Sequence, residues 1–534
     1  MLAQAPLWLA LAYRRAGRFV GELSRPVRAA IAGAVLAAAL ARWVLAPLRL
    51  VMLYVGYQHT AEAIALQPIP RYGAAGPALH HALLRVFPAD HRTTLVAHAI
   101  LGVAIVPLLA ALAHSLHRRA ATTMAAALLW ALVPAFVAHD NSEAFTVPGL
   151  LAMVAGLVLL AEAVAERRPI ALTGATALLS LAMMFRPELP ILVVAGSVVV
   201  VLAIPSGLAN ARASVAWASP LVLAGAVLVA PHLAHVLASA AWLRSQDSLP
   251  TGSPSLGVSV LDPRLYPALL VPFAVLAAAP FGARGAVEGD LMARAARNAL
   301  LLGLAALDFA LTRLDLDPAN ILRVQVPGAL FFALAAASGM DRAISLLAAR
   351  FATSLARALA GCLVAATALS AIPCLRAAFQ RTNEDEEEAF LRAAREALPA
   401  GDPMLVRLGY GDVEGALSGS PVHLYFPDYL FSPPATPRRV RDIVEWEHDP
   451  TDPHASFYLG VRCYTPERTD DRLDAPRPRS IPMRRACRDI MERWGDGEVL
   501  VRDAPNHGDL LGSRCYGDDT CQPMHLALVR LRHR

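Results

Sequence analysis

Acidic, histidine and arginine side chains stand at the ends of long apolar segments, in connections that contain few other charges. The candidates for proton transfer are Glu62 and Asp140, and the candidates for binding an anion are Arg186 and Arg323. A carboxylate can take the proton of an attacking hydroxyl, and an arginine fork matches the oxygens of a phosphate. These residue types suit an enzyme that combines a general base with a cationic site for a phosphate.

Glu62 stands just after the first apolar segment, in the stretch Val55–Ile64, with His59 close before it. As a general base it would take the proton of an acceptor hydroxyl that attacks a sugar carbon. As an isolated acid it would only be a solvated group at a helix end. The residues alone leave both interpretations open.

A sharper polar cluster between two apolar segments is His139-Asp140-Asn141-Ser142-Glu143. At the start of a helix, Asp140 and Glu143 would lie on one face, near His139 and Asn141. Such a group suits sugar hydroxyls, a divalent ion or the counter-ion of a diphosphate. Alternatively, Asn141 or Ser142 caps the next helix, and Glu143 complements the helix dipole. Both roles are compatible.

Two further sites combine an arginine with a segment end. Arg186 and Glu188 occupy the short connection Phe185–Pro190, and Arg323 begins a later apolar segment that contains Pro327. Each arginine either binds a lipid-linked phosphate or anchors its segment at the membrane interface.

The apolar segments that must position these residues reach the roughly 20 residues needed to cross a bilayer. In a chain of 534 residues that is 56% hydrophobic, they predict an α-helical polytopic membrane protein. Arg42 and Arg49 interrupt the first segment, which we end before Arg49 because charge inside a membrane is costly. We predict about eleven transmembrane helices, at Ala29–Leu48, Thr94–Ala113, Ala121–Val137, Val147–Ala165, Ile170–Met184, Leu189–Ile204, Val215–Leu233, Tyr266–Phe281, Ala296–Leu311, Val324–Ala337 and Phe351–Pro373.

Basic residues mark every second connection, and all of them are arginines because the chain has no lysine. By the positive-inside rule these connections and the N-terminus are cytoplasmic, which places the candidate residues at the outer face. The net charge of +5 therefore reflects arginines that set the orientation of the protein in the membrane, and we expect no nucleic-acid partner. The marking arginines are Arg118/Arg119, Arg167/Arg168, Arg212, Arg284/Arg294/Arg297 and Arg342/Arg350.

An odd number of crossings places the polar C-terminal region outside the cytoplasm, where disulfides form. Its four cysteines lack the close Cys-x-x-Cys spacing of a zinc site, and their pairing is open. They are Cys463, Cys487, Cys515 and Cys521. Short strands are expected at Pro403–Leu408, Val422–Phe426, Ser456–Val461, Glu498–Val501 and His525–Leu531, with a helix at Met483–Trp494.

Three parts follow from this pattern. Residues 1–28 form a cytoplasmic and interfacial segment, residues 29–375 a transmembrane domain, and residues 376–534 a small extracytoplasmic α/β domain. We expect a multi-pass protein of the cell inner (plasma) membrane, with its C-terminal domain in the periplasm.

The order of these motifs resembles the GT-C class of membrane glycosyltransferases, which contains protein mannosyltransferases and lipid A aminoarabinose transferases. The resemblance covers about Arg28 to Arg342. One position departs from the class, because Ala61 precedes Glu62 where members carry their catalytic aspartate. The segments that carry the resemblance are Thr60–Ile64, Arg71–Gly73, Arg186–Glu188 and the Arg323/Pro327 pair.

The resemblance implies a polyprenyl-phosphate sugar donor and a lipid, glycan or protein acceptor. Glu62 would be the base of an inverting transfer, Asp140 an acceptor ligand or base partner, and Arg186 and Arg323 the phosphate clamps. If Glu62 has not taken the role of the missing aspartate, then Asp140 has, or the chain is not catalytic. No cofactor is certain, and a divalent metal is left open.

Two other classes compete with an enzyme. A transporter or flippase of a lipid-linked substrate would place ionisable residues near the membrane midplane, often in two repeated halves. Here the charges gather at one face and no repeat is visible. A non-catalytic membrane scaffold is supported by the missing aspartate alone.

Overall fold

The computed structural model describes two compact units, a helical one and one that contains a sheet. For the strands and for residues 318–324 only the backbone is described, so the side chain of Arg323 lies outside the description. The described residues are 5–45, 75–86, 92–142, 146–186, 189–204, 266–280, 288–312, 318–351, 404–406, 423–425, 457–464, 498–502 and 524–531, with single positions at 212, 216, 219, 223, 227, 230, 355 and 366.

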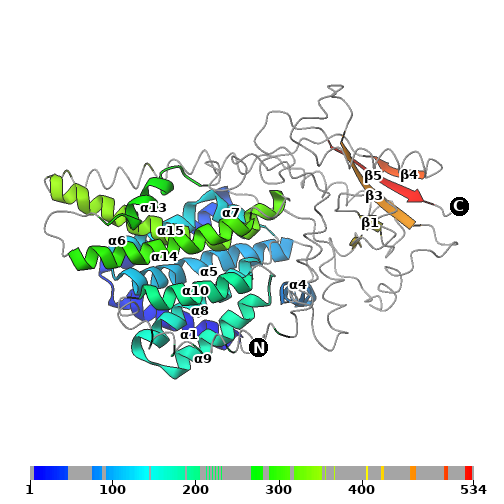
Figure 1. The fold of residues 1–534 in the computed structure, drawn as a ribbon. Coiled ribbons are helices and arrows are strands. Elements are labelled where there is room, and N and C mark those ends of the chain that lie inside the picture. The colour runs from blue at the N-terminus through cyan, green and yellow to red at the C-terminus, as the bar shows by residue number, and fades with distance from the viewer. Residues whose placement is uncertain are drawn as a thin grey trace. The chain divides into compact units, whose positions relative to one another are not determined.

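The helical unit is a bundle in which helices distant in sequence lie side by side (Figure 1). Its helices are α1 (Ala5–Glu22), α2 (Arg25–Leu40), the π-helical turn η2 (Ala41–Leu45), α5 (Arg92–His117), α6 (Ala120–Leu132), α7 (Pro134–Asp140), α8 (Thr146–Glu166), α9 (Pro169–Met183), α10 (Leu189–Ala203), α13 (Leu270–Ala278), α14 (Glu288–Thr312) and α15 (Pro318–Arg350).

Among the described residues, four helices are long and apolar enough to cross a membrane. They are Arg25–Leu45, Thr93–His117, Thr146–Glu166 and Gln325–Arg350, and the pair α6–α7 adds a fifth if it is one bent span. The helical, apolar character predicted from the sequence is confirmed. Most of Val215–Leu233 and Phe351–Pro373 lies outside the described residues, so the total of about eleven stays a prediction.

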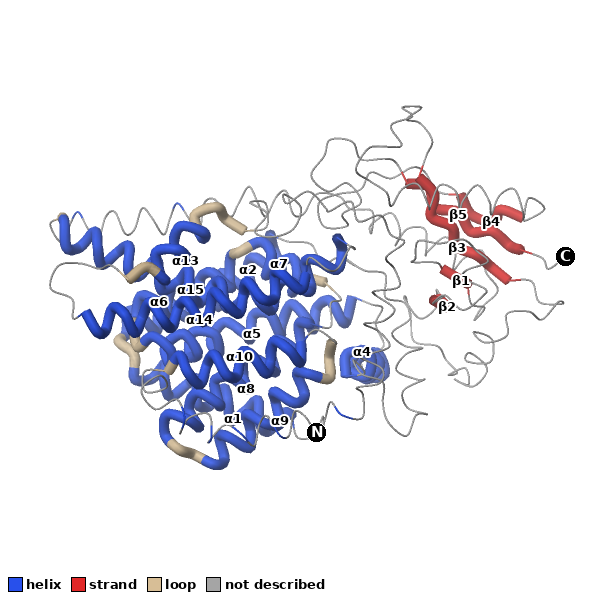
Figure 2. The backbone as a smooth tube through the Cα atoms, viewed as in Figure 1, coloured by secondary structure: helices blue, strands red, loops and turns tan. Residues whose placement is uncertain are grey.

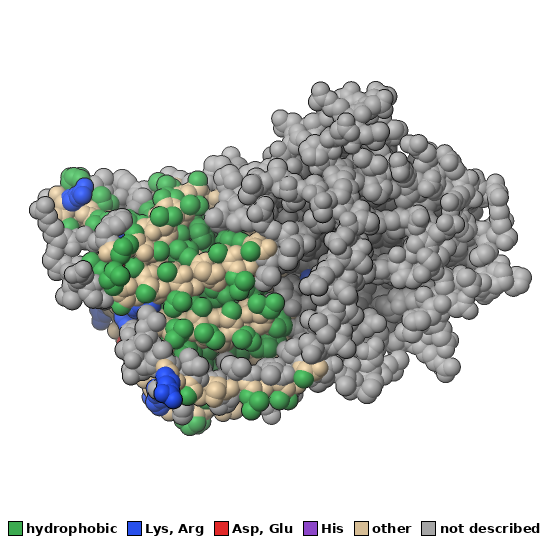
Figure 3. Space-filling model, viewed as in Figure 1, with side chains coloured by type: hydrophobic (Ala, Val, Ile, Leu, Met, Phe, Trp, Pro, Cys, Tyr) green, Lys and Arg blue, Asp and Glu red, His purple; other side chains and the backbone are tan. Residues whose placement is uncertain are grey.

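The centre of the helical unit is α8, in which every residue from Thr146 to Val164 is buried. A helix that is apolar on all sides needs neighbours on all sides. Helices α1, α9 and α10 supply them, and α15 packs against α6, α13 and α14 in the same unit. Hydrophobic side chains also cover the outer face of the bundle, with basic ones at its left edge in Figure 3, as expected where lipid surrounds the helices.

One predicted transmembrane helix is divided into two helices in the structure. The segment Ala121–Val137 was expected to be a single helix, but α6 ends at Leu132 and α7 begins at Pro134, at an angle of 56° to it. Proline has no N–H to donate and clashes with the preceding turn. Val133 between them is extended, with φ −65° and ψ 124°.

The second unit contains α4 (Ala75–Val86) and a mixed five-stranded sheet of order β2-β1-β3-β5-β4 (Figure 2). Strands β1 and β3 are parallel, and the other neighbours are antiparallel. All five strands lie where the sequence predicts them, although the helix expected at Met483–Trp494 lies outside the described residues. The strands are β1 (Met404–Val406), β2 (His423–Tyr425), β3 (Phe457–Tyr464), β4 (Glu498–Arg502) and β5 (Met524–Leu531).

Candidate active site

An arginine that interrupts the first apolar segment, Arg42, lies at the centre of a buried polar network. Arg42 stands in the π-helical turn η2, and its side chain is fully buried. Turns of this kind inside α-helices often occur at functional sites. An ionisable residue within an apolar segment needs a buried partner. The position of Arg42 in such a segment was therefore the feature of the sequence that could have indicated this network.

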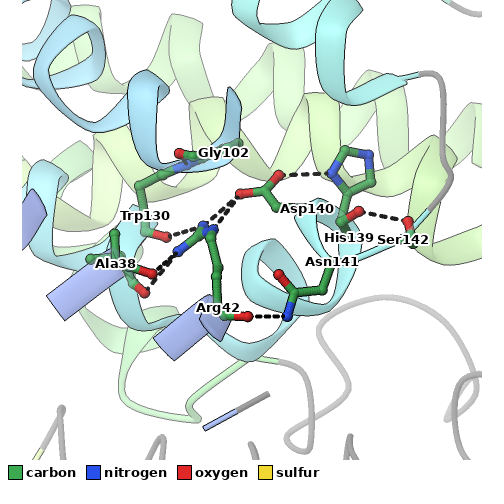
Figure 4. Close-up of polar contacts among 9 residues, drawn as sticks. Ala38, Arg42, Gly102, Trp130, His139, Asp140, Asn141 and Ser142 are labelled. Atoms are coloured by element: carbon green, nitrogen blue, oxygen red, sulfur yellow. Dashed lines mark hydrogen bonds and ion pairs between the residues drawn. The ribbon is translucent and has the colours of Figure 1, made fainter. Parts of the chain in front are cut away.

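The guanidinium of Arg42 has an acceptor for each of its five N–H donors (Figure 4). Nε and Nη2 both donate to Oδ2 of Asp140, at 3.0 and 2.5 Å. Nη2 also donates to the Trp130 carbonyl at 3.2 Å, and Nη1 to the carbonyls of Ala131 and Ala38, each at 3.3 Å. Arg42 therefore has no donor left for a substrate.

Two of the carbonyls that Arg42 binds, those of Trp130 and Ala131, lie at the break between α6 and α7. In a continuous helix the Trp130 carbonyl would accept the N–H of residue 134, but Pro134 has none. The extended backbone at Val133 ends α6 and leaves its last carbonyls without helical partners. A cation at this position also complements the negative end of the helix dipole. Arg42 thus stabilises the break.

Both oxygens of Asp140 are engaged as well. Oδ1 lies 3.2 Å from Nδ1 of His139, and Nε2 of that histidine is hydrogen-bonded to the hydroxyl of Thr146 at the start of α8. The carboxylate rests against Gly102 in α5, where any Cβ would collide with it. The Trp130 indole donates to the Gly102 carbonyl at 2.9 Å, which holds α5 and α6 together at this point.

The turn that follows Asp140 is tied to two other helices. The Asn141 amide donates to the Arg42 carbonyl at 2.8 Å, and the Ser142 hydroxyl donates to the His139 carbonyl at 2.6 Å. Nδ1 of His98 in α5 lies 2.7 Å from the Ser142 carbonyl. The predicted cluster is therefore a buried turn held by η2, α5 and α7.

Residues 75–235, which include this turn, match the family model of dolichyl-phosphate-mannose-protein mannosyltransferases. The predicted resemblance is confirmed over those residues. Two solved structures are also similar. ArnT from Cupriavidus metallidurans, in the apo state, is 11% identical with a TM-score of 0.48, over 93% of this chain and 97% of that one.

The archaeal oligosaccharyltransferase AglB from Archaeoglobus fulgidus, in complex with an inhibitory peptide and a dolichol-phosphate, is 14% identical with a TM-score of 0.46. The match covers 70% of this chain and spans 58% of the length of AglB. No curated protein matches the chain.

The mannosyltransferase-like segment contains only part of the predicted site. The predicted residues inside it are His139, Asp140, Asn141, Glu143, Arg186 and Glu188, and Arg42 lies outside it. Arg186 is partly exposed beyond the end of α9 and has a partner of its own. The remaining predictions lie outside the described residues: His59, Glu62, Glu143, Glu188 and the side chain of Arg323. The described structure unites the His139–Asn141 cluster with Arg42 and does not place Glu62.

Metal binding was left open by the sequence. Within the described part of the chain, no group of three or more His, Cys, Asp or Glu side chains could hold an ion. Since Glu62 and Glu143 are outside that part, a divalent ion stays a prediction. The same holds for the disulfides: only the backbone of Cys463, in β3, is described.

Arginines gather at the far ends of the helices that meet at this network. Helix α6 begins at Ala120, next to Arg119, and ends at Leu132, near the network. Helix α8 runs from Thr146 to Glu166, a length of about 30 Å at 1.5 Å per residue. At that far end Arg119 contacts Asp341 at 3.1 Å, and Arg15 contacts Glu162 at 3.0 Å. The described helices thus separate the polar cluster from the arginine-marked connections, as the sequence pattern predicted.

Proposed function

We propose that the chain is a membrane glycosyltransferase that moves a sugar from a polyprenyl-phosphate donor to a lipid, glycan or protein acceptor at the outer membrane face. The match of residues 75–235 to dolichyl-phosphate-mannose-protein mannosyltransferases carries this proposal, because dolichyl phosphate is a polyprenyl phosphate. The separation of the polar turn from the arginine-rich connections supports an active site at one face of the bundle.

We assign the base to Glu62 and a positioning role to Asp140. Asp140 is fully buried, and both of its oxygens already have partners, so an acceptor hydroxyl cannot reach it without breaking the network. Glu62 would take the proton of the acceptor while that oxygen attacks the anomeric carbon, and the sugar–phosphate bond breaks with inversion. His139 and Asn141 would hold the buried turn in place, as Asp140 does.

Cationic support for the departing phosphate would come from Arg186 and Arg323, since guanidinium forks match phosphate oxygens. Arg186 is partly exposed at the end of α9, where a lipid-borne group can approach it. The remaining candidates, His59, Glu143 and Glu188, would bind sugar hydroxyls.

The topology that this function requires is part of the proposal. About eleven spans would place the N-terminus in the cytoplasm and residues 376–534 in the periplasm, with disulfides among the four C-terminal cysteines. A reporter that is active only outside the cytoplasm, fused after Arg381, should be active. A cytoplasmic C-terminus would overturn this orientation.

The test of the function compares Glu62→Gln with Glu166→Gln in proteoliposomes that contain a polyprenyl-phosphate sugar and glycan acceptors. Glutamine keeps size and hydrogen bonding but cannot accept the proton, so Glu62→Gln should lower turnover by about 10²–10⁴ with little change in donor affinity. Glu166 lies 44% exposed at the far end of α8, paired with Arg168, and its variant should transfer sugar normally.

Near-normal turnover in Glu62→Gln would remove the base assignment. Movement of the donor lipid across the bilayer without sugar transfer would favour the transporter alternative instead.

A further inference from the structure

A second buried aspartate joins two helices near the end of the bundle that contains Arg42. Asp308 in α14 is almost fully buried, and its Oδ2 accepts the backbone N–H of Gly328 in α15 at 2.8 Å. A side-chain carboxylate thus serves as an acceptor for a backbone group of the neighbouring helix. Such charge-assisted hydrogen bonds are roughly twice as strong as neutral ones.

The contact falls on the turn of α15 that contains Pro327. Pro327 lies inside this helix and has no N–H, so the carbonyl of Arg323 lacks its usual helical partner. Proline sites are where long helices bend, and the bend there is set by whatever else holds the turn. Asp308 binds the first N–H after Pro327 and so supplies an external anchor at this place.

The fit between Asp308 and Gly328 is steric as well as polar. A Cβ on Gly328 would collide with the carboxylate, so glycine is required for the close approach of the two helices. Phe309, next to Asp308, packs against Phe332, one turn beyond Gly328, with ring centroids 6.3 Å apart. The crossing of α14 and α15 is therefore held by a hydrogen bond and by an aromatic contact one turn away.

We propose that Asp308 is a positioning residue for Arg323. By fixing the turn around Pro327, it holds the preceding turn, which carries Arg323, in one orientation relative to α14. This role rests on the proposed function, in which Arg323 contacts the donor phosphate. A misplacement of about 1 Å in such a group can cost on the order of 10²-fold in rate.

The test measures the KM values of donor and acceptor separately in purified Asp308 variants. Asp308→Ala removes the anchor and should raise the donor KM about 10-fold or more, with the acceptor KM unchanged. Asp308→Asn keeps an oxygen that can accept the Gly328 N–H, so it should retain most of the wild-type donor KM. Gly328→Ala should resemble Asp308→Ala, and the double variant should be no worse than either single one, because both remove the same contact.

The control is Asn298, which joins the same two helices by a hydrogen bond from its Nδ2 to the Ser338 hydroxyl at 3.1 Å. Ser338 is ten residues beyond Gly328, about 15 Å along α15. Asn298→Ala should lower the amount of folded protein but leave the donor KM unchanged. A merely structural role of Asp308 would give the same pattern as Asn298.

Unchanged donor KM in Asp308→Ala, with transfer by the wild-type protein intact, would overturn the role of Asp308 alone. If the wild-type protein transfers no sugar from any polyprenyl-phosphate donor, the proposed function fails and this role with it. Should Asp308→Ala not fold, Gly328→Ala displaces the carboxylate without deleting it and decides the same question.

Discussion

Two arginine–aspartate pairs stand at opposite ends of the helices of one bundle. Arg42 and Asp140 are 2.5 Å apart and both side chains are fully buried. Arg119 and Asp341 are 3.1 Å apart, and the arginine side chain is 42% exposed. The residue types are the same and the distances are similar, but only one pair is shielded from water.

Burial decides what each pair contributes to stability. An exposed pair contributes roughly 0–1 kcal/mol, because water and salt screen it and two side chains lose freedom. Removing one partner of a buried pair costs about 3–5 kcal/mol, because the other charge stays behind without compensation. Arg42 also binds the carbonyls freed by Pro134, so its loss would leave backbone groups without partners too. The number of ion pairs is therefore a poor guide to stability in this molecule.

The largest effect is expected from Arg42→Leu. It leaves the Asp140 carboxylate and two carbonyls buried without their donor, so the free energy of unfolding should fall by about 3–5 kcal/mol. Denaturant unfolding in detergent micelles measures this loss. The double variant Arg42→Leu/Asp140→Leu should recover part of it, since no buried charge then remains. A loss below about 1 kcal/mol in the single variant would mean that burial does not distinguish the two pairs.

A smaller loss is expected from Gly102→Ala, in which the new methyl group pushes the Asp140 carboxylate away from Arg42. Overpacking of this kind costs about 1–3 kcal/mol. Gly303→Ala is the matched control, because a Cβ there meets nothing within 4 Å and alanine favours the helix. Equal unfolding midpoints for the two variants would show that the carboxylate has room to move.

The smallest effect is expected from Arg119→Leu, the same substitution as in the first prediction, at the partly exposed pair. Its unfolding free energy should lie within about 1 kcal/mol of the wild type, and added salt should reduce the difference further. A loss as large as that of Arg42→Leu would contradict the comparison. It would show that the Arg119–Asp341 pair contributes as much to the free energy of unfolding as the Arg42–Asp140 pair.

Local patterns in the sequence predicted much of the fold. Apolar segments of membrane length located α2, α5 and α8, and short β-branched and aromatic runs located all five strands. The prediction of one continuous helix at Ala121–Val137 was wrong, because it rested on the hydropathy of the segment and ignored Pro134 within it. Pro134 was visible in the sequence, but whether a proline bends a span or divides it depends on what can satisfy the freed carbonyls. Here Arg42 satisfies them, from a position 88 residues away from Trp130.

The site was only partly predictable for the same reason. The cluster at His139–Asn141 was evident from its polar residues, because such residues are rare among apolar segments. Its interpretation changed once Arg42 was found against Asp140, 98 residues away in sequence. Asp308 is a second case, because its carboxylate accepts the N–H of Gly328, a backbone group of another helix that side-chain patterns in the sequence do not indicate.

Composition and spacing by themselves determined the apolar, helical character of this protein, the location of many of its helices and strands, and the separation of the arginine-marked connections from the cluster at His139–Asn141. These properties depend on neighbours a few positions apart, which a sequence states directly. Only the tertiary structure decided which buried charges meet. That choice depends on the π-helical turn at Arg42, the break at Pro134 and the absence of a Cβ at Gly102, which together bring η2, α5 and α7 within hydrogen-bonding distance.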